Sequence, residues 1–119
     1  MKTMNEWETQ IRLRFPKKLF KRAIGFCFSW QAWFIAYDVF DCEPEEFLQR
    51  DPGEQMNALA YGAAFWYCVR RRERVFFTYP DMVKALDWAS MEDNKKIDEA
   101  LKSAQFPDWM EPVKMKVKP

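Results

Sequence analysis

The residues that most often carry out chemistry in proteins are sparse in this sequence. The chain of 119 residues has no histidine, which removes the commonest general base and the commonest metal ligand. Its three cysteines, Cys27, Cys42 and Cys68, form no CxxC pair and are odd in number. This usage is typical of buried thiols in a reducing compartment, and not of a disulfide framework or a metal site. No phosphate-binding motif of the GxGxxG or GxxxxGK[ST] type is present.

Carboxylates gather in one stretch near the end of the first third of the chain. They are Asp38, Asp41, Glu43, Glu45 and Glu46. Their spacing is too loose for the paired carboxylates of a glycosidase, and it lacks the glycine and the regular spacing of an EF-hand loop. We therefore predict a solvated acidic loop, and we expect no enzymatic activity, no cofactor and no metal.

The densest charge feature is a group of arginines interrupted only by Glu73. It comprises Arg70, Arg71, Arg72 and Arg74. One interpretation is a solvated helix end that complements the helix dipole. A second is a docking patch for an acidic protein surface. A third is contact with nucleic-acid phosphates, although no aromatic platform or recognition helix accompanies the arginines, and a net charge of +1 argues against a general polyanion binder.

Aromatic residues are abundant: eleven Phe, six Trp and four Tyr make up 18% of the chain. Each ring buries roughly 150–250 Å² when it is covered, so we expect most rings in the core and several at the surface as interface anchors. Trp30, Trp33, Phe34 and Tyr37 follow the spacing i, i+3, i+4, i+7, which places them on one helical face. This group is the best candidate for an exposed anchor surface, and the same spacing also suits burial.

The first half of the chain is predicted to contain a strand and three helical segments. Ile11, Leu13 and Phe15 alternate with Arg12 and Arg14, which predicts a short strand or extended segment that Pro16 closes. Helices are expected over Lys17–Phe28 and Trp30–Phe40. A short helical turn is expected around Glu45–Gln49.

The second half is predicted to contain three helices. The middle of Glu54–Arg74 is apolar nearly all round, which predicts a central buried helix, and Gly62 to Ala64 would let another helix approach closely. Thr78, followed by Pro80 and Asp81, predicts the start of the next helix, whose inner side would carry Met82, Val83, Leu86 and Ala89. A capping pattern at Ser90–Asp93 begins the last helix, which runs to about Gln105 with Ile97, Leu101 and Ala104 in register.

These elements predict a mainly α fold. We expect a single compact helical domain over residues 1–106, with about four to five helices and the short N-terminal strand, and a C-terminal coil over 107–119. The uncharged runs Ala23–Tyr37 and Ala58–Val69 have fifteen and twelve residues, whereas a membrane-spanning helix needs about 20. The N-terminus lacks the basic-then-apolar pattern of a secretory signal. A cytoplasmic location without membrane contact is therefore expected.

From Glu45 to Ala104 the order of predicted elements follows a recognisable pattern. A long helix with small and aromatic residues precedes a helix start of threonine, acidic residue and valine; a leucine-aspartate helix end and a last helix finishing in glutamate, alanine and serine follow. The matching positions are Thr78, Asp81, Val83, Leu86, Asp87, Glu99, Ala100 and Ser103. In this pattern the chain resembles the tail assembly chaperones of tailed bacteriophages.

The resemblance implies a non-enzymatic chaperone in the bacterial cytoplasm, which binds the tape measure protein, and often tail tube subunits, during tail assembly. Partner helices would pack on apolar side chains of Trp30–Tyr37 and Tyr61–Tyr67, and Arg70 to Arg74 would steer acidic surfaces. One alternative is a small adaptor or inhibitor that binds a host protein. A nucleic-acid-binding regulator is the weaker alternative, and self-association is left open.

Overall fold

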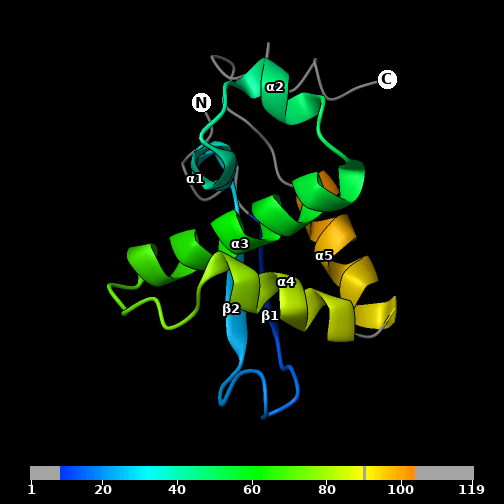
Figure 1. Cartoon of the computed structure of the whole chain (residues 1–119). Coiled ribbons are helices and arrows are strands. Elements are labelled where there is room, and N and C mark those ends of the chain that lie inside the picture. The colour runs from blue at the N-terminus through cyan, green and yellow to red at the C-terminus, as the bar shows by residue number, and fades with distance from the viewer. Residues whose placement is uncertain (1–8, 90, 104–119) are drawn as a thin grey trace.

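The computed structural model describes residues 9–89 and 91–103, and this part of the chain is mostly helical (Figure 1). An antiparallel sheet of β1 (Thr9–Leu13) and β2 (Ile24–Phe28) comes first. Five helices follow, namely α1 (Trp30–Phe40), α2 (Pro44–Leu48), α3 (Pro52–Arg70), α4 (Tyr79–Trp88) and α5 (Met91–Ser103). The predicted fold class is confirmed. The predicted C-terminal coil lies outside the described residues.

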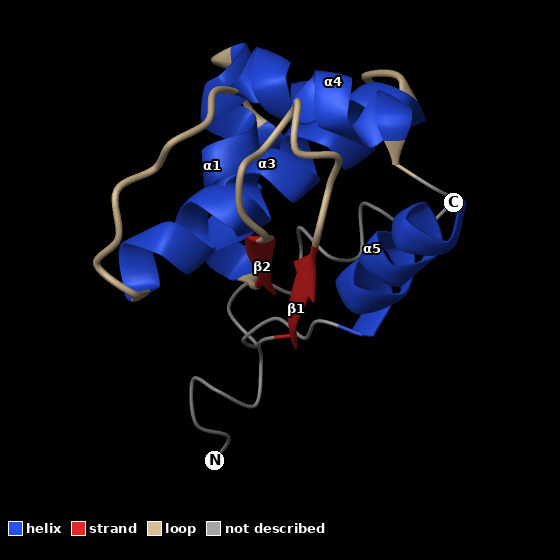
Figure 2. Ribbon diagram, turned by 90° about the horizontal axis from the view of Figure 1, so that it is seen from below, coloured by secondary structure: helices blue, strands red, loops and turns tan. Residues whose placement is uncertain are grey.

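β1 forms where apolar and basic residues alternate, as the sequence predicts. Leu13 is buried and Ile11 is half-buried, whereas Gln10 and Arg12 are exposed, because successive side chains of a strand point to opposite faces. The register with β2 sets Ile11 opposite Phe26. Figure 2 shows β1 on the side of α5, whereas β2 packs against α3.

The predicted helix over Lys17–Phe28 is wrong. Residues 17–19 form a turn, and Ile24–Phe28 form β2. Every residue of β2 is buried, and a strand covered on both faces is apolar throughout, without the alternation that marks a half-exposed strand. The apolar spacing that indicated a helix combined two separate segments, a turn and a buried strand.

α1 has the predicted bounds, and it packs closely against α3. It ends at Asp41, whose φ of 48° is left-handed and whose N–H bonds back to the carbonyl oxygen of Asp38. A Cβ on Gly62 would meet the carbonyl oxygen of Ala32, so only glycine permits this distance between the two helices. The predicted close approach at this position is confirmed.

α3 ends earlier than the sequence predicts. Its last helical residue is Arg70, Arg71 is the C-cap, and Arg72 adopts a left-handed φ of 57°. The expected cationic last turn therefore retains Arg70 alone, and the other arginines lie on the link to α4. α3 begins at Pro52 under the cap of Asp51, which accepts a hydrogen bond from the N–H of Gly53.

The predicted start of α4 is confirmed by a reciprocal capping box. The hydroxyl of Thr78 accepts from the N–H of Asp81, and the carboxylate of Asp81 accepts from the N–H of Thr78. Met82 and Leu86 are buried as expected, and Ala85 joins them. α5 buries Ile97 and Ala100 and packs against β1. The predicted cap at Ser90 and the end at Gln105 lie outside the described residues.

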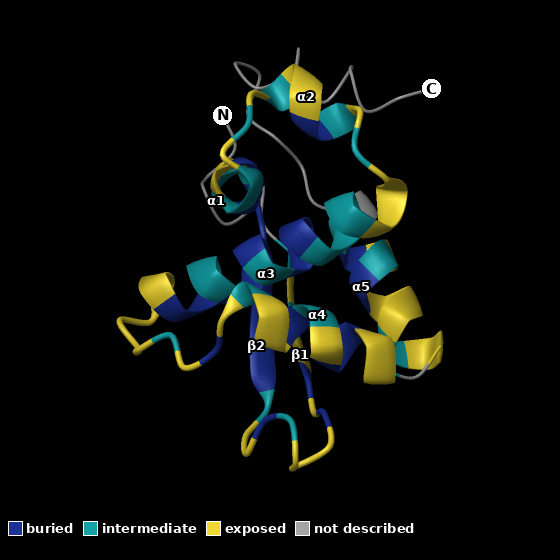
Figure 3. Cartoon of the chain, in the orientation of Figure 1, coloured by how far each residue is buried: buried dark blue, intermediate teal, exposed yellow. Residues whose placement is uncertain are grey.

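α3 crosses the middle of the molecule and separates two groups of buried side chains (Figure 3). The larger group joins the sheet to α3, α4 and α5, and includes Phe26, Phe28 and Met82. The smaller group joins α1 and α2 to the first half of α3, and centres on Phe47. Five of the seventeen buried residues of the larger group and three of the six of the smaller group are aromatic, so many of the rings help to hold the fold together.

Candidate functional site

The predicted anchor surface on α1 is divided between the core and the surface. Trp33 and Tyr37 are each only 5% exposed, and both rings contact Phe47 of α2. Phe34 is 44% exposed, and the half-buried Trp30 packs edge-on against it at 5.6 Å between ring centroids. The part of the predicted group that a partner could touch is therefore the pair Trp30 and Phe34.

The four predicted arginines are all exposed, but the structure does not keep them together. Arg70 and Arg71 border a depression beside the sheet with Gln10 and Tyr67. Arg72 and Arg74 lie on the link between α3 and α4. Because α3 stops at Arg70, the four arginines are divided between the end of the helix and the link that follows it.

Arg71 is the most constrained of these arginines. Its Nε donates to a carboxylate oxygen of Glu73 at 2.9 Å, and its guanidinium lies 5.3 Å from the ring centroid of Tyr67. The hydrogen bond to Glu73 and the nearby charges raise the pKa of Arg71. Arg71 is therefore fixed as a permanently charged donor.

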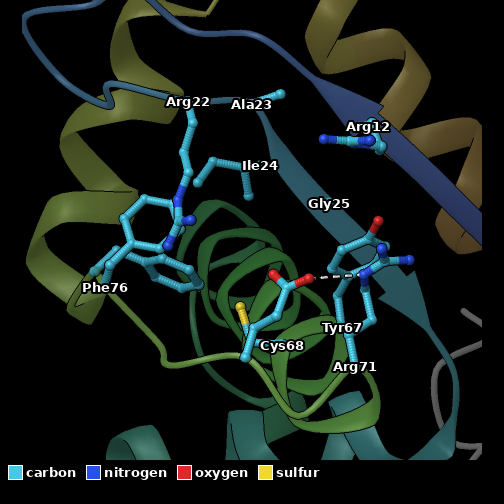
Figure 4. A pocket seen from close by; sticks show the side chains of 11 residues that line it. Arg12, Arg22, Ala23, Ile24, Gly25, Tyr67, Cys68, Arg71 and Phe76 are labelled. Atoms are coloured by element: carbon cyan, nitrogen blue, oxygen red, sulfur yellow. Dashed lines mark hydrogen bonds and ion pairs between the residues drawn. The ribbon is translucent and has the colours of Figure 1, made fainter.

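A cavity of about 200 Å³ lies where β1, the β1–β2 connection and the end of α3 meet (Figure 4). Arg12 comes from β1, Arg22 from the connection and Arg71 from the C-cap of α3, and all three line it together with Glu73. Apolar and aromatic residues complete the wall, among them Ile24, Tyr67 and Phe76. Because a guanidinium group only donates hydrogen bonds, such a site binds an anionic group and does not take up its proton.

Gly25 makes this cavity possible. The ring of Tyr67 lies so close that a Cβ at position 25 would meet it. Tyr67 thereby packs against the strand and forms one wall of the cavity.

The next residue of α3, Cys68, also lines the cavity. Burial raises the pKa of its thiol, Glu73 raises it further and Arg22 opposes them, so the sulfur stays protonated and is not a nucleophile at neutral pH.

Sequence reasoning missed a larger cationic region, which we call the basic end. It consists of Arg12, Arg14, Lys17, Lys18, Lys21 and Arg22, all exposed on β1 and the β1–β2 connection. Residues 12–22 contain no carboxylate, and within residues 9–89 and 91–103 none of these six cations forms an ion pair. The cation-rich run itself was the available signal, but the sequence predicted a strand with Arg12 and Arg14 and a separate helix from Lys17, so the six cations were not expected on one surface.

Exposed apolar side chains lie beside the basic end. Trp88 at the end of α4 is 58% exposed, Met91 at the start of α5 is 90% exposed, and Phe76 is 37% exposed. The Nζ atom of Lys18 lies 4.2 Å from the ring centroid of Trp88, and the guanidinium of Arg22 lies 4.2 Å from that of Phe76. The basic end therefore combines unpaired charge with apolar surface.

The carboxylates gather at the opposite end of the molecule, which we call the acidic end (Figure 1). It consists of the exposed residues Asp38, Asp41, Glu43, Glu45 and Glu46, around the end of α1 and the start of α2. Glu43 and Glu46 form a capping box, so part of this charge stabilises the start of α2. Burial, with Cys42 and Glu45 nearby, raises the pKa of Tyr37 to about 12.

Comparison with known proteins adds no family. No family model, no curated protein and no solved structure matches this chain.

Among the described residues no three or more His, Cys, Asp or Glu side chains are placed so that they could hold a metal ion. None of the described helices is long and apolar enough to cross a membrane. The chemistry of the described surface is therefore the guide to what this chain does.

Proposed function

We propose that this chain is a protein-binding module, without enzymatic activity, that contacts its partner through the basic end and the adjacent apolar side chains. The observation that carries the proposal is the exposure of Phe76 and Trp88 beside the basic end, whose six cations have no carboxylate partner in the described chain. Apolar surface rimmed by charge is characteristic of interaction sites. Tryptophan in particular is enriched among the residues that dominate binding energy.

Charge and apolar surface would act at different stages of binding. Exposed cations attract an acidic partner from a distance and raise the association rate more than the affinity. Burial of Trp88 and Met91 would then supply affinity, at roughly 25 cal/mol per Å² of apolar surface removed from water. This assignment replaces the contact proposed for Trp33 and Tyr37, because both rings are already buried in the core.

The resemblance over residues 45–104 suggests a more specific partner. Within the same proposal, the partner is the tape measure protein or a tail tube subunit of a tailed bacteriophage, which the chain keeps soluble during assembly. Thr78 and Asp81, two of the residues that carry the resemblance, form the capping box at the start of α4. A host protein bound by a small adaptor or inhibitor is the alternative partner.

Nucleic acid is a less suitable ligand for this surface. Single-stranded chains bind by stacking bases on accessible ring faces along a cationic groove. At the basic end a cation of the chain itself, Lys18 or Arg22, already lies over each exposed ring. A base would have to displace that cation before it could stack on Trp88 or Phe76.

Co-expression with a candidate tape measure protein tests the proposal. The soluble yield of the partner should rise with the wild-type chain and fall about tenfold or more with Trp88→Ala, the effect expected for a residue that dominates binding. Phe34→Ala is the matched control, because Phe34 is an exposed ring on α1, outside the basic end.

The opposite pattern would overturn the assignment. If Phe34→Ala abolishes the gain and Trp88→Ala preserves it, the contact surface is the Trp30–Phe34 pair. If the chain instead binds a single-stranded oligonucleotide with a steep salt dependence, phosphate contacts dominate, and the protein-binding proposal is wrong.

A further inference from the structure

The cavity beside Tyr67 brings together three arginines that are far apart in the sequence. Arg12, Arg22 and Arg71 come from three different segments, and all three line this cavity (Figure 4). Guanidinium groups repel one another, so their convergence costs free energy unless an anion compensates it. One carboxylate, that of Glu73, lines the cavity with these three cations and bonds to Arg71 at 2.9 Å. Within the described residues, Arg12 and Arg22 have no carboxylate partner.

The size of the cavity limits what it can hold. Its volume is about 200 Å³, below the roughly 300–1,000 Å³ of typical small-molecule sites. This space suits one side chain with a short aliphatic stem. The stem would lie against the apolar part of the wall, at Ile24 and Phe76, and its head group would reach the arginines at the rim.

We propose that this cavity accepts an aspartate or glutamate side chain of the partner protein, and that Glu73 occupies the place of that carboxylate in the unbound chain. The proposal rests on the protein-binding function proposed above, and it specifies what the partner presents. The Glu73 carboxylate shows that a carboxylate on a short stem reaches Arg71 with good hydrogen-bond geometry. The partner's carboxylate would take the place of Glu73 and would also compensate Arg12 and Arg22.

A carboxylate fits this site better than a phosphate of a nucleic-acid backbone does. A phosphodiester belongs to a long chain, which needs an open groove along its path, whereas this cavity is bounded by the sheet, Tyr67 and Phe76. The anionic group that the structure already places there is a carboxylate. Arginine pairs readily with carboxylates through two parallel hydrogen bonds.

The glycines of the chain provide a direct test by nuclear magnetic resonance. Glycine amides give a distinct set of signals, and this chain has three glycines. Gly25 lines the cavity, Gly62 is buried between α1 and α3, and Gly53 lies at the start of α3. Titration with a capped glutamate hexapeptide should move the Gly25 signal and leave those of Gly53 and Gly62 unchanged.

A glutamine hexapeptide of the same length is the matched probe without charge. No movement of Gly25 with the glutamate peptide, or equal movement with both peptides, would overturn the inference. Inorganic phosphate forms the third arm. If phosphate shifts the Gly25 signal at a lower concentration than the glutamate peptide does, the cavity is a phosphate site. The assignment to a protein carboxylate is then wrong.

Three variants sharpen the test. Arg12→Gln should lower the affinity for the glutamate peptide about fivefold to tenfold, because a hydrogen bond to a charged group is lost from a partly exposed site. Glu73→Gln should strengthen binding several-fold, because it removes the internal competitor. Arg74→Gln is the control, since Arg74 is exposed on the α3–α4 link and does not line the cavity. Equal affinities for wild type, Arg12→Gln and Glu73→Gln would contradict the inference.

Failure of this inference can be told apart from failure of the proposed function. If Trp88→Ala abolishes partner binding while Arg12→Gln and Glu73→Gln leave it unchanged, the protein-binding function stands and the carboxylate pocket does not. If Trp88→Ala has no effect on the partner but the Gly25 titration succeeds, the pocket stands and the surface proposed for the partner is wrong.

Discussion

The basic end and the acidic end carry opposite charge, and they use their side chains in different ways. At the acidic end, Glu43 and Glu46 cap α2, Arg50 pairs with Glu54 at 2.9 Å, and the neighbouring ring of Phe47 is fully buried. At the basic end the cations lack carboxylate partners among the described residues, and Phe76 and Trp88 are exposed. Much of the acidic end is used for capping and packing, whereas the basic end leaves its cations and two rings exposed.

This difference explains why the net charge of +1 is a poor guide to the molecule. Charges that cancel in the total are separated in space, so each end produces its own local field. A surface that evolves for stability pairs its charges and covers its rings. A surface that binds keeps both accessible until the partner arrives, and the basic end has this character.

The largest effect expected from this comparison comes from removing one ring at each end. Phe47→Ala should destabilise the fold by roughly 3–5 kcal/mol, because Phe47 is fully buried and contacts Trp33, Tyr37 and Phe40. Trp88→Ala should cost less than about 1 kcal/mol, mainly the contact with Lys18. Urea unfolding of both variants measures the contrast, and similar losses would contradict the division between a structural and a binding end.

A smaller effect is expected from a methyl group at one glycine of each end. Gly25→Ala should cost roughly 1–3 kcal/mol, because its Cβ would force the Tyr67 ring away from the strand. At Gly53 the added Cβ meets only the flexible carboxylate of Asp51, at 2.9 Å, so Gly53→Ala should stay within about 0.5 kcal/mol of wild type. Thermal unfolding measures the loss of stability in both variants. A larger loss for Gly53→Ala than for Gly25→Ala would show that the Tyr67 ring can move to make room for the added methyl group.

The smallest effect concerns the acidic end and its dependence on pH. Within the described part of the chain the buried hydroxyl of Tyr37 has no hydrogen-bond partner, so Tyr37→Phe should stabilise the fold by about 1 kcal/mol at neutral pH. Burial raises the pKa of Tyr37 from 10.0 to about 12, so the folded state holds this proton more tightly than the unfolded chain does. The contribution of the protonated Tyr37 side chain to the free energy of unfolding is therefore fully present below pH 10. It is lost as the pH rises towards 12.

Denaturation at a series of pH values separates the two parts of this prediction. The difference between Tyr37→Phe and wild type should widen between pH 10 and 12, because only the wild type has a proton to lose at this position. Curves that stay parallel over that interval would show that Tyr37 ionises equally in both states. Burial also raises the pKa values of Tyr61 and Tyr79. Both residues are present in wild type and variant, so their titration does not change the difference in stability between the two.

Local signals in the sequence predicted the elements that depend on local interactions. The bounds of α1 follow from its aromatic spacing, and the start of α4 follows from the cap formed by Thr78 and Asp81. β2 could not be predicted in this way, because both of its faces are buried and its apolar residues show no period. The early end of α3 was also missed, because arginine is a good helix former and no glycine or proline marks the boundary at Arg70.

The candidate site was predicted less well than the fold, because burial and convergence are tertiary properties. The spacing of Trp30, Trp33, Phe34 and Tyr37 is the same whether the face is buried or exposed, and the structure buries two of the four. Arg71 was selected from sequence, but its neighbours Arg12 and Arg22 were assigned to other elements. Only the antiparallel pairing of β1 with β2 brings those two residues to the end of α3.

The packing of α5 against β1 sets the order in which the chain can complete its fold. β1 ends at Leu13 and α5 begins at Met91, so a ribosome makes nearly every other described element between them. Until synthesis has passed α5, the strand keeps Ile11 and Leu13 uncovered on one side and is prone to pair with other chains. Final closure is thus a late event, and truncation before Ile97 should yield aggregates instead of a smaller folded protein.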